Sequence, residues 1–123
     1  MRLLRSIGLL YLLSGLWCAF APEQAAAFLG YGSLSASGRA EFFTVYGGLQ
    51  CGLGVAMIGC SAIARCLPGA LLMSALFSSL LALFRLFSLF SLGGLSSELL
   101  MLLLLEVTIA LLFIAGSRRA MSA

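Results

Sequence analysis

The stretch that decides the fold is Glu41 to Ser61, EFFTVYGGLQCGLGVAMIGCS. It is apolar enough to enter a membrane, it is dense in glycine, and polar residues stand at its head. Small residues recur at every fourth position and would form one ridge on an α-helix: Gly48, Gly52, Ala56 and Cys60. Such a ridge lets another membrane helix approach closely. The stretch therefore predicts a central membrane helix with a packing surface.

The composition of the whole chain agrees with a membrane environment. Of its 123 residues, 63% are hydrophobic and 9% are charged, whereas a soluble domain is typically about 45–50% apolar and about 25% charged. A chain of this length is expected to form one domain, residues 1–123. The formal charge of +3 comes from arginines at the ends of apolar segments, with no basic stripe, which argues against nucleic acid as a partner.

Apolar segments and turn signals divide the chain into four membrane spans. Apolar segments predict helices at about residues 3–21, 41–64, 68–91 and 98–116. Pro22 lacks the N–H that would continue the first helix, and Pro68 suits the first turn of the third. The longest connection, residues 22–40, is expected to hold one short helical turn near Ala25–Leu29 and then a flexible loop. Short connections elsewhere predict an all-α four-helix transmembrane bundle in up-down-up-down order.

The first apolar segment allows two interpretations. Its basic start, its apolar core and the sequence Ala19-Phe20-Ala21 are also typical of a cleaved signal peptide. Pro22 directly after such a cut argues against cleavage, and the apolar run is long enough to span a bilayer. We favour a membrane helix that is retained.

The arginines predict the orientation of the spans. Five of the seven lie on one side if the N-terminus is cytoplasmic: Arg2, Arg5, Arg65, Arg118 and Arg119. Cytoplasmic ends of membrane helices are enriched in arginine and lysine. Both termini are therefore expected in the cytoplasm.

The third span carries a second ridge of small residues, Ala70, Ser74, Ser78 and Ala82. It repeats the four-residue spacing found in the second span, so the two ridges are expected to pack together. The serines are expected to bond their own helix or a neighbour, because the chain has no histidine or lysine to activate them as nucleophiles.

Two charged residues, Arg85 and Glu106, fall inside apolar spans. A lone charge at mid-membrane costs roughly 2.5–3.5 kcal/mol, so such residues usually pair or face the interior. We predict a polar cluster in the outer half of the membrane that contains Arg39, Glu41, Tyr46, Gln50, Arg85 and Glu106. One interpretation is an ion pair that only sets helix register. The other is a site for a proton, a small cation or a polar ligand.

No catalytic, metal or cofactor site is expected from the sequence. The four cysteines, Cys18, Cys51, Cys60 and Cys66, form no C-x-x-C pair, and there is no histidine to complete a metal site. The same absences disfavour a membrane-embedded redox enzyme. Cysteines inside apolar spans usually behave as small hydrophobes.

Short motifs in this chain resemble a family of bacterial membrane proteins. The matching pieces are Arg39 and Glu41 before Tyr46-Gly47-Gly48, then Arg85-Leu86-x-Ser88, then Glu106. On these residues the chain resembles the proteins grouped as domain of unknown function 4345. It departs from their pattern at Phe84, where a small residue is common, and at residues 91–94, which contain no acid. The resemblance implies a four-helix protein of the bacterial inner membrane and supplies no activity.

The function predicted from the residues is a structural or accessory one, exerted through helix packing in the lipid bilayer. The partner would be either a second copy of the chain or another membrane subunit. The alternative is a carrier, or a protein that binds a proton or a small ligand through the Arg85–Glu106 cluster.

Overall fold

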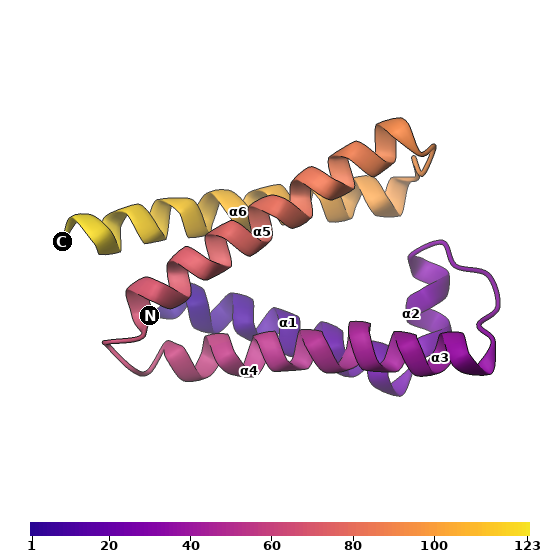
Figure 1. Ribbon diagram of the computed structural model, residues 1–123, viewed down its shortest axis with the longest axis horizontal. Helices are drawn as coiled ribbons and strands as arrows, with labels where there is room; N and C mark the ends of the chain where they lie inside the picture. Colours follow the sequence, from indigo (N-terminus) through magenta and orange to yellow (C-terminus); the bar gives the residue numbers. More distant parts are fainter. The chain divides into compact units, whose positions relative to one another are not determined.

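The computed structural model describes residues 1–123, and its regular structure is entirely helical (Figure 1). Four helices are long and apolar enough to cross a membrane: Arg2–Phe20, Ala36–Cys60, Leu67–Ser91 and Ser97–Ser122. The predicted all-α class and the four apolar spans are confirmed at this level. By its internal contacts the chain divides into two compact units, Met1–Ala62 and Ile63–Ala123, which are described separately below.

The first unit is built on two helices that lie side by side and run in opposite directions. They are α1 (Arg2–Phe20) and a longer helix made of α3 (Ala36–Phe42), η1 (Phe43–Leu49) and α4 (Gln50–Cys60). Their backbones touch through glycines. A Cβ added at Gly54 would lie 2.6 Å from the Gly8 carbonyl oxygen, and one added at Gly15 would lie 2.7 Å from the Cys51 nitrogen. Only glycine permits such an approach.

The surface that α1 uses differs from the predicted ridge. Helix α1 packs on Gly47, Cys51, Gly54 and Met57. The ridge of Gly48, Gly52, Ala56 and Cys60 is turned away from α1, and a Cβ at Gly48 or Gly52 would meet no atom within 4 Å. The reason lies in the spacing. Gly8 and Gly15 are seven residues apart, as are Gly47 and Gly54, and seven residues make about two helical turns. The packing role of the other ridge stays a prediction.

The long helix starts five residues earlier than predicted, ends earlier, and is not α-helical throughout. Ser35 caps its start by accepting a hydrogen bond from the Gly38 N–H, so the helix begins at Ala36. The helix ends at Cys60. The carbonyl oxygen of the next residue, Ser61, accepts a hydrogen bond from the N-terminal ammonium at 2.8 Å. Between these ends η1 is a π-helix of 7 residues. A π-helical turn contains an extra residue and is rare in proteins.

The connection between the two helices is better ordered than a flexible loop. It contains α2 (Pro22–Phe28), which opens on a proline and overlaps the predicted turn at Ala25–Leu29. Gly30, with a positive φ of 91°, ends α2. Ala25 and Ala26 of α2 pack with Cys18 and Phe42 in a small buried cluster. This cluster holds α2 and the loop after it against the ends of α1 and α3.

The second unit is an antiparallel hairpin of α5 (Leu67–Ser91) and α6 (Ser97–Ser122) (Figure 1). Gly93, with a φ of 71°, lies in the turn, and Ser96 caps α6 by accepting a hydrogen bond from the Leu99 N–H. Ser74 and Ser78 of the predicted ridge are buried on α5. Helix α6 runs past its predicted end at residue 116 and includes Arg118 and Arg119. Positive side chains in a last turn favour that extension, because they complement the helix dipole.

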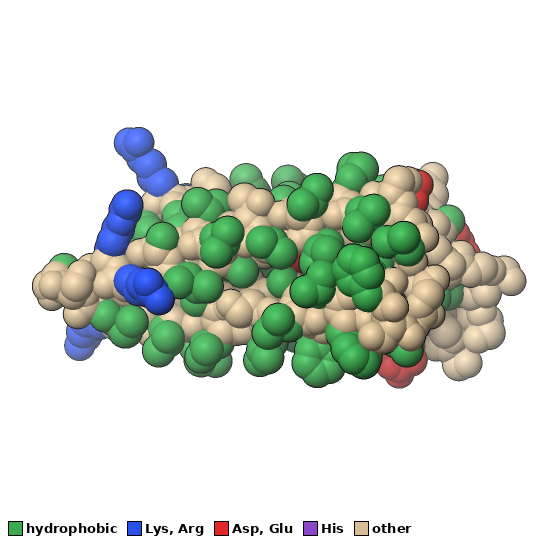
Figure 2. All heavy atoms as spheres, turned by 90° about the horizontal axis from the view of Figure 1, so that it is seen from above, with side chains coloured by type: hydrophobic (Ala, Val, Ile, Leu, Met, Phe, Trp, Pro, Cys, Tyr) green, Lys and Arg blue, Asp and Glu red, His purple; other side chains and the backbone are tan.

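The outer surfaces of the helices are apolar, as a lipid environment requires. Figure 2 shows hydrophobic side chains along their lengths and basic side chains near their ends. Large exposed side chains on the hairpin include Leu80, Phe84, Phe87 and Leu104. In water these side chains would form an unusually large apolar patch. The long helices therefore suit lipid as their solvent.

Candidate functional site

Arg85 and Glu106 form a two-point ion pair across the α5–α6 hairpin. Arg85 Nε donates to Glu106 Oε2 at 2.6 Å, and Arg85 Nη2 donates to Glu106 Oε1 at 2.8 Å. Glu106 is 9% exposed. Paired hydrogen bonds between a guanidinium and a carboxylate are short, strong and geometrically specific. The pair therefore neutralises two charges within the apolar hairpin and joins its two helices.

A buried hydroxyl lies on the same face of α5 as Arg85. Ser78 is seven residues before Arg85, which is about two helical turns. Its Oγ is buried and has no hydrogen-bond partner, whereas the Ser79 hydroxyl donates to the Ala75 carbonyl at 2.7 Å. A buried polar atom without a partner is costly and is often the place where a water or a ligand binds.

Arg39 pairs with Glu23 rather than with its neighbour Glu41. The Arg39 guanidinium contacts the Glu23 carboxylate, which α2 brings to the start of α3, and both side chains are exposed. Residues two apart on a helix do not face each other, so Arg39 and Glu41 diverge. An exposed pair of this kind contributes little stability. Its main effect is on the local charge, because it leaves Glu41 without a salt bridge.

Gln50 joins the two long helices of the first unit. Ser14 Oγ of α1 donates a hydrogen bond to Gln50 Oε1 at 2.8 Å. Both residues lie beside the glycine contacts, next to Gly15 and Cys51. Side-chain hydrogen bonds between membrane helices stabilise their association. The structure thus assigns Gln50 to helix packing.

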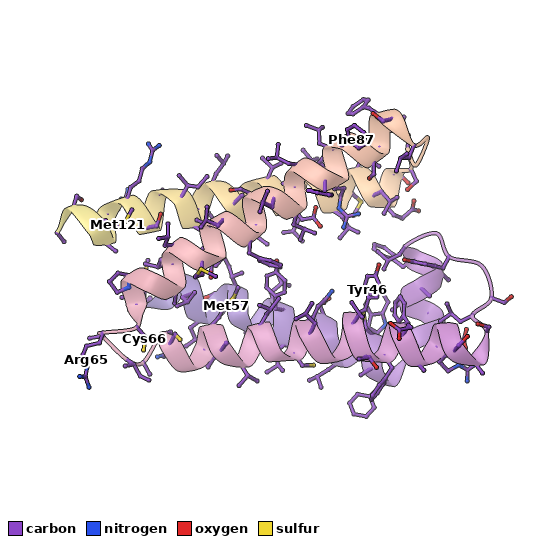
Figure 3. The ribbon with its side chains drawn as sticks, viewed as in Figure 1. Tyr46, Met57, Arg65, Cys66, Phe87 and Met121 are labelled. Carbon is purple, nitrogen blue, oxygen red and sulfur yellow. The ribbon has the colours of Figure 1, made fainter.

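Tyr46 belongs to an aromatic group at the α2–α3 end of the first unit. Its hydroxyl shares a hydrogen bond of 3.0 Å with the Tyr31 hydroxyl. Its ring stacks on Phe42 with centroids 4.5 Å apart, and Tyr31 lies edge-on to both rings. In Figure 3 the Tyr46 side chain lies on the side of the long helix that faces α2. Phe42 is buried in this group, whereas its neighbour Phe43 is 56% exposed.

A pocket of about 410 Å³ opens beside this aromatic group. Tyr31, Leu34, Glu41, Phe42, Val45 and Tyr46 contribute to its lining. The side chains come from the loop after α2, from α3 and from η1. Glu41 is the one charged residue of the lining, and Ser33 and Ser35 also contribute, so the pocket combines apolar walls, the hydroxyls of two tyrosines and two serines, and one carboxylate.

The six residues of the predicted polar cluster therefore have different partners. Arg85 and Glu106 meet in the second unit. In the first unit Arg39, Tyr46 and Gln50 each bind a residue that the predicted cluster did not include: Glu23, Tyr31 and Ser14. Glu41 lines the pocket. Of these three partners, only Ser14 has a signal in the sequence, because it stands next to a glycine of α1 and so near a surface where helices can pack closely.

Comparisons with known proteins give no name to either site. A scan against models of protein families, a search of curated proteins and a search of solved structures each found no match. No group of three or more His, Cys, Asp or Glu side chains is placed to hold a metal ion. From their arrangement alone, the residues can support three roles: association of helices, pairing of charges in lipid, and binding of a small polar group.

Proposed function

We propose that this chain is a multi-pass protein of the bacterial inner membrane, a four-helix bundle of the family that it resembles, with both termini in the cytoplasm. Its role in this proposal is structural or accessory and is exerted through helix packing. The observation that carries it is the glycine contact of α1 with α4, where a Cβ at Gly54 would lie 2.6 Å from both the Gly8 oxygen and the Leu12 nitrogen. Such close backbone contact is typical of helices that associate in lipid.

Two further observations support the proposal. The face of Gly48, Gly52, Ala56 and Cys60 is open in the first unit, and its small side chains leave room for one more helix. In the second unit the charges of Arg85 and Glu106 cancel within the hairpin. The same helices can therefore present an apolar exterior to lipid or to a partner helix.

The mass of the full-length protein in detergent tests this proposal, with a second copy of the chain as the first partner to consider. Gly52→Leu fills the open face, and Val55→Leu is its control, because Val55 is already a large exposed side chain on the same helix. We expect the wild type and Val55→Leu to form the same oligomer and Gly52→Leu to lose it. A wild-type protein that is monomeric without any other subunit bound would contradict the accessory role.

A second candidate function is that of a carrier or binding protein for a proton or small ligand at Arg85 and Glu106. The buried Ser78 hydroxyl without a partner favours it, because an unfilled hydrogen-bonding position lies on the face of α5 that carries Arg85. The double variant Arg85→Met with Glu106→Gln separates the two candidates. If the variant folds and cells that carry it behave like cells with the wild-type protein, the carrier fails. If it folds and the phenotype equals that of deletion, the purely structural role of the pair fails.

A further inference from the structure

We infer that the pocket at the α2–α3 end of the first unit binds a small organic ammonium ion, with the Glu41 carboxylate as its counter-ion. This goes beyond a role in helix packing and uses none of the residues at the glycine contact. The inference depends on the volume of the pocket, the charge around it and the groups that line it.

The volume suits an organic group rather than a bare ion. Ligand pockets usually have a volume of about 300–1,000 Å³, and this open pocket has a volume of about 410 Å³. Apolar walls are provided by Leu34, Phe42 and Val45. A bare metal ion would require several oxygen ligands, whereas Glu41 is the one carboxylate of the lining. A substituted ammonium matches this lining, because its alkyl groups contact apolar walls while its charge needs a single anion.

The sign of the charge around the pocket favours a cation. Residues 22–50 contain three charged side chains, Glu23, Arg39 and Glu41. Arg39 is paired with Glu23, so the charge of Glu41 is not balanced by a neighbour in this segment. The net charge of the segment is one negative, from two acids and one base. An anionic ligand would be repelled here, and a monovalent cation would be attracted.

The aromatic group supplies the other contacts that ammonium ions prefer. Aromatic rings attract cations through the negative charge on their faces, and quaternary ammonium ions are often held among several rings. Tyr31 is 47% exposed, so part of its ring is open to a ligand. The Tyr31 hydroxyl oxygen has two lone pairs, so besides its hydrogen bond with Tyr46 it can accept one from an N–H donor of the ligand.

The position of the pocket allows the ammonium group to come from two sources. Tyrosines are enriched where membrane helices meet water, and the pocket lies near the start of the long helix, next to the loop after α2. A free amine could enter from water. The ethanolamine or choline headgroup of a lipid could enter from the membrane surface with its acyl chains outside the pocket.

Titration of the full-length protein in detergent with tetramethylammonium and with ethylammonium tests the inference, at ionic strength held constant with sodium chloride. Binding can be followed by saturation-transfer NMR. Glu41→Gln removes the counter-ion, and Glu98→Gln is the matched control, since Glu98 is an exposed acid at the start of α6. We expect saturable binding to the wild type and to Glu98→Gln, weakened on the order of tenfold in Glu41→Gln. Absence of saturable binding of both cations, or equal affinity in Glu41→Gln, would overturn the inference.

A second arm distinguishes the sources of the ammonium group. The protein is reconstituted in nanodiscs that contain phosphatidylethanolamine, phosphatidylcholine and phosphatidylglycerol, and its retained lipids are identified by native mass spectrometry. Retention of the ethanolamine or choline lipid by the wild type and its loss in Glu41→Gln would support binding of a headgroup. Binding of free amines without such retention would support a soluble ligand. Unfolding curves of Glu41→Gln that match those of the wild type exclude misfolding, and Tyr31→Phe provides a second pocket variant whose affinity is expected to fall.

Discussion

Gly54 of α4 lies so close to Leu12 of α1 that a Cβ at position 54 would stand 2.6 Å from the Leu12 backbone nitrogen. The atom in the way belongs to the backbone and cannot rotate aside. The contact therefore depends on the absence of a side chain at this position. It is repeated one step along the helix pair, where Gly15 meets the backbone of Cys51.

Substitution of this glycine should separate the two helices. We expect Gly54→Ala to destabilise the first unit by about 1–3 kcal/mol, the usual cost of overpacking. Gly59→Ala is the control, because a Cβ there meets no atom within 4 Å and Gly59 lies outside the face proposed for association, and alanine is favoured over glycine in a helix by about 1 kcal/mol. Thermal unfolding in detergent measures both. Equal stability of the two variants would show that the glycine contact contributes nothing.

The Arg85–Glu106 pair should behave as a coupled unit. Removing one partner leaves an uncompensated charge in the hairpin, which costs about 3–5 kcal/mol for buried pairs. We therefore expect Arg85→Met or Glu106→Gln alone to destabilise the protein strongly. The double variant should recover most of that loss, because it leaves no charge unpaired. A double-mutant cycle from unfolding curves measures the coupling, and simple additivity of the two single losses would argue against a closed pair.

The π-helical turn allows us to predict where the long helix of the first unit tolerates the deletion of one residue. A π-helical turn amounts to one extra residue in an α-helix. Deletion of Thr44 would place Phe42 four residues before Gly47, so both would still share a face in an uninterrupted α-helix. We expect this deletion to be tolerated. Deletion of Val55 should instead rotate Met57 and Ser61 away from α1 and unfold the unit.

Unfolding temperatures of the two deletion variants test the point. Thr44 is exposed, and its hydroxyl donates only to the Ala40 carbonyl of its own helix, at 2.8 Å. Its loss therefore removes no contact between helices. If the Thr44 deletion were as damaging as the Val55 deletion, the extra residue would not be what the π-helical turn accommodates.

The sequence predicts the secondary structure well because lipid simplifies the problem. Apolar runs of sufficient length become helices, and Pro22, Pro68 and the glycines near residue 93 mark where they end or begin. The cost of a lone charge in lipid likewise favours a pair of Arg85 with Glu106. These inferences need no knowledge of the tertiary structure.

Details that depend on two elements together were not predicted. Helix α1 packs on the face that carries Gly47 and not on the face that carries Gly48, because the seven-residue spacing of the glycines in α1 matches that of Gly47 and Gly54. The sequence of one helix alone does not reveal such a match. The partner of Arg39 is Glu23 because α2 folds back toward α3. The π-helical turn lets Phe42 be buried on the same face on which Gly47 contacts Ala19. Because this requirement comes from contacts with other helices, the local sequence does not predict the turn.

The central proposal is that the chain crosses the membrane four times with both termini in the cytoplasm. Reporter fusions to the full chain after Ala123 and within the loop at Gly32 test it in one experiment. We predict that a reporter active only in the cytoplasm works after Ala123, and that a reporter active only after export works at Gly32. An exported reporter that is active after Ala123, or a cytoplasmic one that is active at Gly32, would contradict the account.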